Sequence, residues 1–152
     1  MFLGSFKYSI DSKGRVSIPA KLRKFVSPEA NDGFVMTRGT EKCIEVHPMD
    51  EWKLLADEKL EKLNTFNPQE ALFLRMFLAE AGEDKLDTQS RLLLPKNLIK
   101  HAELEREVVI IGAMKKIEIW NPKNYDSYVS GTDLSFAEVA EKVMSKNNDV
   151  KE

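Results

Sequence analysis

Apolar and polar side chains alternate near the start of the chain. The alternation over residues 6–10 predicts a strand with one buried face. The next four residues have turn chemistry, because the side chain of Asp11 can cap its own backbone and Gly14 tolerates a positive φ. Alternation resumes at residues 16–18, and Pro19 ends it because proline cannot donate to a strand ladder.

This pattern occurs twice. Residues 11–23 read DSKGRVSIPAKLR and residues 87–99 read DTQSRLLLPKNLI, so Asp, Arg, Pro and Leu recur at one constant offset. The other elements predicted in the two halves are a helix at 20–26 with strands at 34–37 and 43–46, and a strand at 84–87, a helix ending at His101 and strands at 108–111 and 117–120. A repeat sustained over strands, turns and helices predicts an α+β fold in which two tandem half-barrels form one pseudo-symmetric β-barrel with flanking helices.

Two helices are predicted between the halves. Asp50 is the expected N-cap of a helix over 51–63 that has one apolar face. Asn67 and the proline after it predict a second helix over 68–81, which Gly82 is expected to end. The second helix has more large apolar side chains than one narrow stripe needs. It is either buried between the two halves or, together with the C-terminal helix, seats a neighbouring copy of the chain.

The pattern divides the chain into four segments. A last amphipathic helix is predicted from Ser135, and the polar tail from Ser145 to Glu152 is expected to fray. The segments are repeat 1 (5–50), the connecting helices (51–80), repeat 2 (81–124) and the C-terminal helix with its tail (125–152).

The composition indicates a packed interior with a charged surface. The 152 residues suit one compact domain, or two small halves that share a core. The sequence is 42% hydrophobic and 32% charged, and no apolar run approaches the roughly 20 residues that a membrane-spanning helix needs. We expect no signal peptide, because the N-terminus lacks its basic and apolar regions. The single Cys43 cannot form an internal disulfide, which fits a reducing cytoplasm.

The charge is unevenly distributed. The net charge of the chain is −2, but residues 1–26 carry six cations against Asp11 alone, a net of +5, so the remaining 126 residues carry −7. The six cations are Lys7, Lys13, Arg15, Lys21, Arg23 and Lys24. A basic segment on an acidic body is typical of a surface that faces a polyanion, although chance clustering would give the same count.

Several motifs together resemble the MraZ family of bacterial proteins, which are built from two SpoVT-AbrB-type repeats. They are the opening Met-Phe-x-Gly, the Asp11–Arg15 turn, the Pro-x-x-x-Trp after the fourth strand and the degenerate second copy. The resemblance covers residues 1–145. It implies two swapped β-hairpins that interlock into one AbrB-like barrel, and ring-shaped homo-oligomers in the cytoplasm and nucleoid.

The resemblance also implies a function. Members of the family are transcriptional regulators, usually repressors, that bind short direct repeats in the double-stranded promoter DNA of their own division and cell-wall gene cluster. We therefore expect DNA and a second copy of the chain as partners, and no membrane, small-molecule substrate or cofactor. Two alternatives stay open: an AbrB-like antitoxin or other protein-interaction module, and a structural assembly protein whose basic segment binds nothing.

The family's DNA-facing element maps onto Asp11–Arg15, with Lys13 and Arg15 as the charged contacts. An arginine after a tight turn can bind a phosphate through two hydrogen bonds or read guanine O6 and N7. Gly14 would permit the turn and a close approach to DNA, whereas Asp11 is expected to cap the turn, since DNA repels a carboxylate. Four further cations either widen the footprint or are solvated surface charges: Lys7, Lys21, Arg23 and Lys24.

The second copy departs from the first at the turn. Gln89 and Ser90 replace Lys13 and Gly14, so the second turn is expected to have another shape and no DNA contact. The carboxylate and guanidinium shared by both copies have a structural turn role, which we assign to Asp11, Asp87 and Arg91 and, less exclusively, to Arg15.

Enzymatic chemistry has little support in the sequence. His47 and His101 lie in separate halves with no nucleophile or carboxylate at motif spacing, so we expect both to be structural. Cys43 lies in an apolar strand and is expected to be a small buried side chain. Adjacent Glu83 and Asp84 are expected in a solvated turn. No zinc-ligand spacing or glycine-rich phosphate loop occurs, so we expect no catalytic residue and no metal site.

Overall fold

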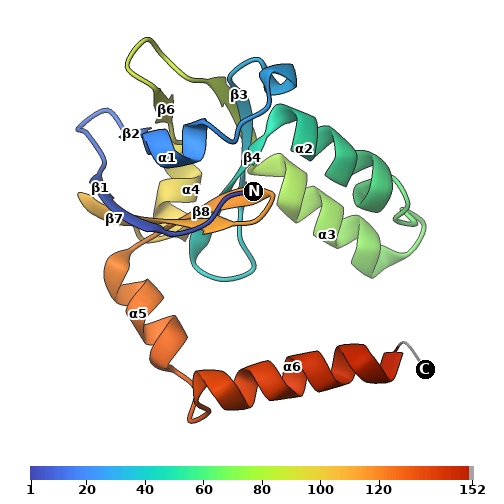
Figure 1. Ribbon diagram of the computed structural model, residues 1–152. Coiled ribbons are helices and arrows are strands. Elements are labelled where there is room, and N and C mark those ends of the chain that lie inside the picture. Colours follow the sequence, from blue (N-terminus) through green and yellow to red (C-terminus); the bar gives the residue numbers. More distant parts are fainter. Residues whose placement is uncertain (151–152) are drawn as a thin grey trace. The chain divides into compact units, whose positions relative to one another are not determined.

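The computed structural model describes the backbone of residues 1–150 and the side chains of residues 1–146 (Figure 1). The chain forms two compact units, Met1–Pro122 and Lys123–Glu152, and each is described by itself. None of the described helices is both long enough and apolar enough to cross a membrane.

The first unit contains all eight described strands. They are β1 (Ser5–Ser9), β2 (Arg15–Ser17), β3 (Gly33–Arg38), β4 (Cys43–Pro48), β5 (Gly82–Lys85), β6 (Arg91–Leu93), β7 (Glu107–Ala113) and β8 (Lys116–Trp120). Its helices are α1 (Ala20–Arg23), α2 (Met49–Leu55), α3 (Pro68–Ala79) and α4 (Lys96–His101), with a 3₁₀ turn at Pro28–Ala30 and a π turn at Ala56–Leu60.

The strands of the two halves interleave. Six of them form an antiparallel sheet in the order β1-β7-β8-β4-β3-β5, and β2 pairs with β6 in a separate antiparallel ribbon. In the two halves β1 corresponds to β5, β7 to β3 and β8 to β4, so the sheet has the same order when it is followed from either edge. The central β4–β8 pair therefore lies on a pseudo-two-fold axis. Each outer strand, β1 or β5, is paired with a strand of the other half. Neither half can therefore complete the sheet alone.

The α+β class is confirmed, with a large antiparallel sheet, but the closed swapped-hairpin barrel is not. Within residues 1–150, β1 and β5 are the edges of an open sheet. The strands β2 and β6 pair with each other over three residues, and no ladder joins them to the sheet edges.

The core lies between the ribbon and the sheet. Val16 and Leu92 are opposite each other in the ribbon, and both side chains are fully buried. The helices α1 and α4, which follow the proline of each repeat, add Leu22 and Leu98 to this core. The sheet contributes side chains such as Ile110 from β7. Apolar alternation in the two copies thus builds one shared core rather than two.

Several predicted boundaries differ from the structure at the helix that follows β4. Pro48, not Asp50, occupies the N-cap position, because the helix begins directly where the strand ends. The predicted helix over 51–63 is shorter and continues as the π turn at Ala56–Leu60. Helix 20–26 is likewise only a single turn, α1, that Pro19 opens.

The predicted start of α3 is confirmed, but its predicted end is wrong. Asn67 Oδ1 accepts hydrogen bonds from the backbone N–H groups of Gln69 and Glu70 at 2.9 and 3.2 Å. The helix ends at Ala79, and Gly82 opens β5 instead of ending the helix.

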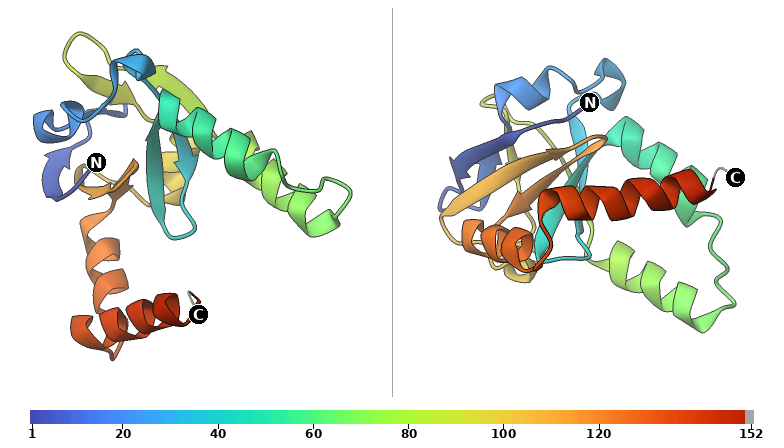
Figure 2. Two further views of the ribbon diagram at one scale, coloured as in Figure 1. Left: turned by 45° about the vertical axis from the view of Figure 1, so that its right-hand side comes forward. Right: turned by 60° about the horizontal axis from the view of Figure 1, so that its bottom comes forward.

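The prediction that α3 is buried between the two halves is wrong. Phe77 contacts Trp52 of α2, with 5.9 Å between ring centroids, and α2 and α3 lie side by side at one end of the first unit (Figures 1 and 2). Four large apolar side chains of α3 remain exposed: Leu72, Phe73, Met76 and Leu78.

The second unit consists of α5 (Pro122–Ser130) and α6 (Phe136–Val150). A capping box starts α6, in which Ser135 and Glu138 exchange side-chain to backbone hydrogen bonds at 3.2 Å. The helix continues to Val150 because no Gly or Pro interrupts it, so the expected fraying from Ser145 is wrong up to that residue; 151–152 lie outside the described residues.

Leu92 and Leu93 are a matched pair for testing the core. Leu92 is fully buried, whereas Leu93 is 51% exposed. We expect Leu92→Ala to lower the free energy of unfolding by about 2–5 kcal/mol, because the cavity that it leaves adds to the lost burial. We expect Leu93→Ala to change it by about 0.5 kcal/mol or less. Urea unfolding followed by circular dichroism measures both, and equal losses would contradict the described orientation of β6.

Candidate nucleic-acid interface

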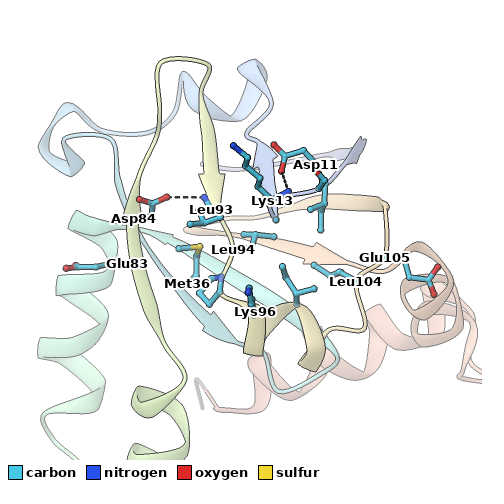
Figure 3. Close-up of a pocket in the computed structure, with 15 residues that line it drawn as sticks. Asp11, Lys13, Met36, Glu83, Asp84, Leu93, Leu94, Lys96, Leu104 and Glu105 are labelled. Atoms are coloured by element: carbon cyan, nitrogen blue, oxygen red, sulfur yellow. Dashed lines mark hydrogen bonds between the residues drawn. The ribbon is translucent and has the colours of Figure 1, made fainter.

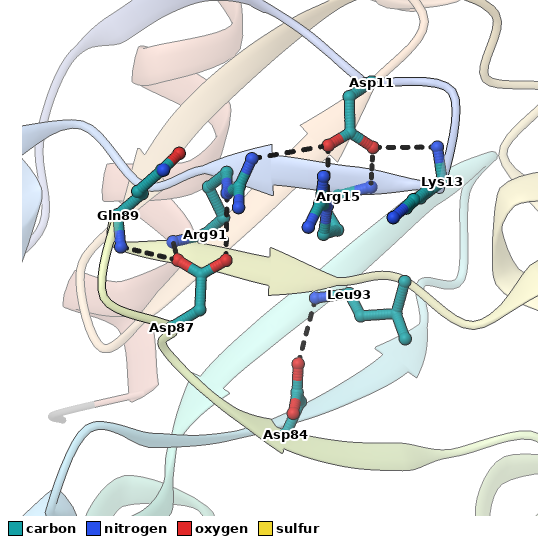
Figure 4. Close-up of polar contacts among 8 residues, drawn as sticks. All are labelled: Asp11, Lys13, Arg15, Asp84, Asp87, Gln89, Arg91 and Leu93. Carbon is teal, nitrogen blue, oxygen red and sulfur yellow. Dashed lines mark hydrogen bonds and ion pairs between the residues drawn. The ribbon is translucent and has the colours of Figure 1, made fainter.

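The turn that precedes β2 is held closed by one aspartate. We call residues Asp11–Gly14 turn 1 and the β2–β6 pair the ribbon. Asp11 Oδ1 accepts hydrogen bonds from the backbone N–H groups of Lys13 and Arg15, both at 2.9 Å (Figure 4). The backbone adds two more bonds, Asp11 N–H to Arg15 O and Gly14 N–H to Asp11 O, at 2.9 and 3.0 Å. The carboxylate is therefore a cap, as the turn chemistry predicted.

Turn 2, residues 87–90, has the same shape. Asp87 Oδ1 accepts from the N–H groups of Gln89 and Arg91 at 2.8 and 2.9 Å. Ser90 has a φ of 60°, and its counterpart Gly14 has a φ of 84°. The expected difference in shape is wrong, because the aspartate bonds common to both copies impose the left-handed residue even where it is not glycine.

Both arginines are held by the turn that precedes them. Arg15 Nε donates to Asp11 Oδ2 at 2.7 Å, and Arg91 Nε donates to Asp87 Oδ2 at 2.9 Å. Arg91 Nη1 also lies 3.7 Å from Asp11 Oδ2, so it links the two turns. The structural role predicted for Arg91 therefore extends to Arg15. Both arginine side chains are partly exposed, that of Arg15 at 30% and that of Arg91 at 24%.

The hydrogen bonds keep both carboxylates ionised. The backbone N–H of Arg15 is the largest influence that holds the pKa of Asp11 below its ordinary value of 3.8. The backbone N–H of Arg91 acts in the same way on the pKa of Asp87. Two carboxylates thus balance two guanidinium groups across the ribbon. Lys13 is an additional, exposed cation that has no ion pair in the part of the chain that the structure describes.

The outer face of the ribbon combines residues of both repeats. Because side chains alternate along a strand, the face opposite Val16 and Leu92 carries the remaining ribbon side chains. These are Arg15, Ser17, Arg91 and Leu93, with Arg15 opposite Leu93 and Ser17 opposite Arg91. Turn 1 also lies at the end of β6, since Leu94 N–H donates to Gly14 O at 2.9 Å, and turn 2 lies at the end of β2, since Ile18 N–H donates to Ser90 O at 3.0 Å.

The other predicted cations do not gather at turn 1. Lys7 is exposed on β1 and Lys21 is exposed on α1. Arg23 Nε donates to Ile18 O at 3.0 Å, which places this side chain at the turn 2 end of the ribbon, where Ile18 also bonds Ser90. Arg23 therefore lies at the end of the ribbon away from turn 1, and Lys7 and Lys21 lie on elements outside the ribbon.

The sequence did not indicate Lys96. An open hollow of about 650 Å³ lies beside turn 1, and both Lys13 and Lys96 line it (Figure 3). Glu83 and Asp84 also line it from β5, so the solvated turn expected for these two residues is wrong. Lys96 has no cationic counterpart in the first copy, where Ala20 follows the proline, so only the pairing of β2 with β6 brings it near Lys13.

The histidines and the cysteine have structural surroundings. His47 Nε2 lies 3.2 Å from Thr37 Oγ1 in a buried position, and His101 Nε2 lies 3.0 Å from Glu41 O. Burial raises the pKa of the Cys43 thiol to about 12. No group of His, Cys, Asp and Glu side chains in the described residues could hold a metal ion.

Comparison with known proteins gives a consistent result. The model of the MraZ family, described as "MraZ protein, putative antitoxin-like", matches residues 1–76 and again residues 77–147. A protein of Natranaerobius thermophilus named transcriptional regulator MraZ is 44% identical over 144 residues, which cover 95% of this chain and 97% of that protein. Proteins of the same name from Alkaliphilus metalliredigens and Caldanaerobacter subterraneus are 43% and 42% identical over 94% and 93% of this chain, and over 96% and 95% of their own lengths.

Ser90→Gly tests the strain in turn 2. A non-glycine residue in the left-handed region costs about 1–2 kcal/mol, part of which the greater unfolded-state freedom of glycine offsets. We expect Ser90→Gly to raise the free energy of unfolding by about 0.5–1 kcal/mol, and Gly14→Ser to lower it, since a Cβ at Gly14 would also lie 3.3 Å from Ile99 Cδ1. Chemical denaturation of both variants checks this, and destabilisation by Ser90→Gly would show that the serine side chain has a role of its own.

Asp87→Asn tests the charge on the cap. A carboxyl group whose pKa is lowered by folding stabilises the protein above its unfolded pKa, and this contribution is lost as the pH falls through the folded pKa. We therefore expect the wild type to be more stable than Asp87→Asn at pH 6, and the difference to shrink below pH 3.8, the ordinary pKa of the group. Urea unfolding at pH 6 and pH 3 measures it. A difference independent of pH would contradict an ionised cap.

Proposed function

The chain belongs to the MraZ family, and from that membership we propose that it is a transcriptional regulator that binds double-stranded promoter DNA through turn 1. The observation that carries the proposal is the exposed Lys13, which has no ion pair among the described residues. It lies beside Arg15, whose Nε is hydrogen-bonded to Asp11. The second copy keeps the aspartate and the arginine but has Gln89 in place of the lysine. The difference between the copies therefore supports a role for turn 1 beyond the architecture that both share.

The geometry suits the major groove of DNA. A two-stranded antiparallel ribbon fits a groove about 12 Å wide. With the outer face of the ribbon in the groove, Arg15 can present its terminal nitrogens to a guanine edge or a phosphate. Lys13 supplies a point charge for a phosphate. Gly14 lets the backbone approach, and the cations at Lys7, Lys21 and Arg23 extend the contact along the backbone of the duplex.

A single copy would bind weakly. Three or four phosphate contacts give a salt slope of only about −3 to −4. We therefore propose a ring-shaped homo-oligomer that presents several copies of turn 1 to spaced direct repeats, since linked sites gain affinity without new contacts. The exposed apolar side chains of α3 supply a surface that can seat a neighbouring copy.

The proposals for the regulated genes and for the sign of regulation rest on the family resemblance alone. We propose that the chain represses its own division and cell-wall gene cluster, and that it acts in the cytoplasm at the nucleoid. Regulation of its own cluster makes the DNA upstream of its own gene the natural probe for binding.

A second candidate function is that of an antitoxin or protein-interaction module. The words "antitoxin-like" in the description of the matching family favour it. In that case the outer face of the ribbon would meet a partner protein, and binding to DNA would be weak and independent of sequence.

Paired substitutions test the DNA-binding proposal. We expect Arg15→Ala to abolish binding to duplex DNA from upstream of the gene and Arg91→Ala to keep most of it, because Arg91 has the same aspartate contact but lies beside turn 2, which lacks the lysine. We expect Lys13→Gln to reduce the salt slope by about 1, since it removes one phosphate contact. Mobility shifts and fluorescence anisotropy at several salt concentrations measure these effects, with Gln89→Lys as the matched control.

Three outcomes would contradict the proposal. Equal loss of binding in Arg15→Ala and Arg91→Ala would indicate damage to the fold or two DNA sites. Equal affinity for the upstream DNA and for a scrambled duplex would favour the antitoxin-like alternative. Equal affinity of the wild type and of a monomerised variant for duplexes with one and with several repeats would exclude the ring as part of the mechanism.

A further inference from the structure

We propose that Leu93 contacts the C5-methyl group of a thymine in the major groove and so contributes to the choice of DNA sequence. This inference rests on the proposed DNA-binding function, and it adds a residue of the second repeat to the recognition surface. Leu92 and Leu94 are buried, whereas Leu93 is 51% exposed on the outer face of the ribbon.

Leu93 lies at the turn 1 end of that face, where Lys13 and Lys96 line the hollow together with carboxylates such as Glu83 and Asp84. It is in register opposite Arg15, and its Cδ1 would lie 4.0 Å from a Cβ placed on Gly14. The absence of a side chain at Gly14 therefore leaves the leucine uncovered next to the two predicted DNA contacts, Lys13 and Arg15 (Figures 3 and 4).

The backbone of Leu93 is fixed by a second partner. Its N–H donates to Asp84 Oδ2 at 3.0 Å, which ties β6 to the neighbouring β5 (Figure 4). The side chain thus projects from a strand that is hydrogen-bonded on both sides. A contact made from such a strand loses little conformational freedom on binding.

The two ends of the ribbon carry different side chains on the outer face, just as the two turns differ in sequence. The counterpart of Leu93 in the first repeat is Ser17, which is opposite Arg91 at the turn 2 end. The end beside Lys13 therefore carries an apolar side chain, and the end beside Gln89 carries a hydroxyl. The thymine methyl is the one apolar group that base edges present in the major groove, which identifies the chemistry that Leu93 can recognise there.

The experiment removes the methyl groups from the DNA without changing its hydrogen bonds. Duplex DNA from upstream of the gene is amplified once with thymidine and once with deoxyuridine triphosphate, and the affinity of each protein for both duplexes is measured by fluorescence anisotropy. Burial of one methyl group is worth about fourfold in affinity, so the wild type should bind the thymine duplex about fourfold more tightly. Leu93→Ala should bind both duplexes equally, because truncation withdraws the apolar surface from the groove.

Two further variants separate this contact from general effects. Leu93→Met keeps an apolar side chain of similar length and should keep the preference for thymine. Phe25→Ala removes an equally exposed apolar side chain, 52% exposed, that lies outside the ribbon, and it should also keep the preference.

Each result decides between the two proposals. A wild type with no preference, a Leu93→Ala variant with an unchanged preference, or a Phe25→Ala variant that loses it would overturn the role of Leu93 while binding that depends on Arg15 still supports the proposed function. Failure of the wild type to bind the thymine duplex at all would overturn both.

Discussion

The pairing of β2 with β6 is the interaction on which the rest of the first unit depends. Two three-residue strands are too short to be stable by themselves. They persist because Val16 and Leu92 bury their side chains against each other and the sheet, and because an aspartate closes the turn before each strand. The same pairing creates the outer face that carries both arginines. The core and the candidate interface are thus two faces of one ribbon, and each constrains what the other can accommodate.

The repeat made much of the fold predictable, because one pattern of turn, strand and proline occurs at one offset and each copy forms the same elements. Strand partners that belong to the other repeat were not predictable. Alternation at Val16 identifies its buried face but not that Leu92 of the other repeat lies opposite, since partner choice depends on the whole chain. The start of α2 was mispredicted for a similar reason: Asp50 is a good N-cap locally, but the helix begins at Met49, directly after the end of β4 at Pro48.

Part of the candidate site was also accessible from the sequence. The capping role of Asp11 and the cationic Lys13 and Arg15 follow from residue type and spacing. Lys96 and Leu93 do not, because they reach turn 1 only across the ribbon. Ser90 shows a different limit: its residue type argues against a left-handed backbone, yet the bonds to Asp87 impose one. In turn 2, hydrogen bonds within the turn override the local preference of serine, whereas strand pairing decides which residues of the other repeat lie near turn 1.

The interleaved sheet has a consequence for synthesis on the ribosome. Ser5 of β1 lies opposite Ile111 of β7, so the first strand has no partner until more than a hundred further residues have emerged. Contacts of such wide sequence separation form late in folding. A chain terminated before Arg91 would contain turn 1 but would lack β6, and hence the ribbon that orients the turn. The outer face therefore cannot form until the second repeat has been synthesised.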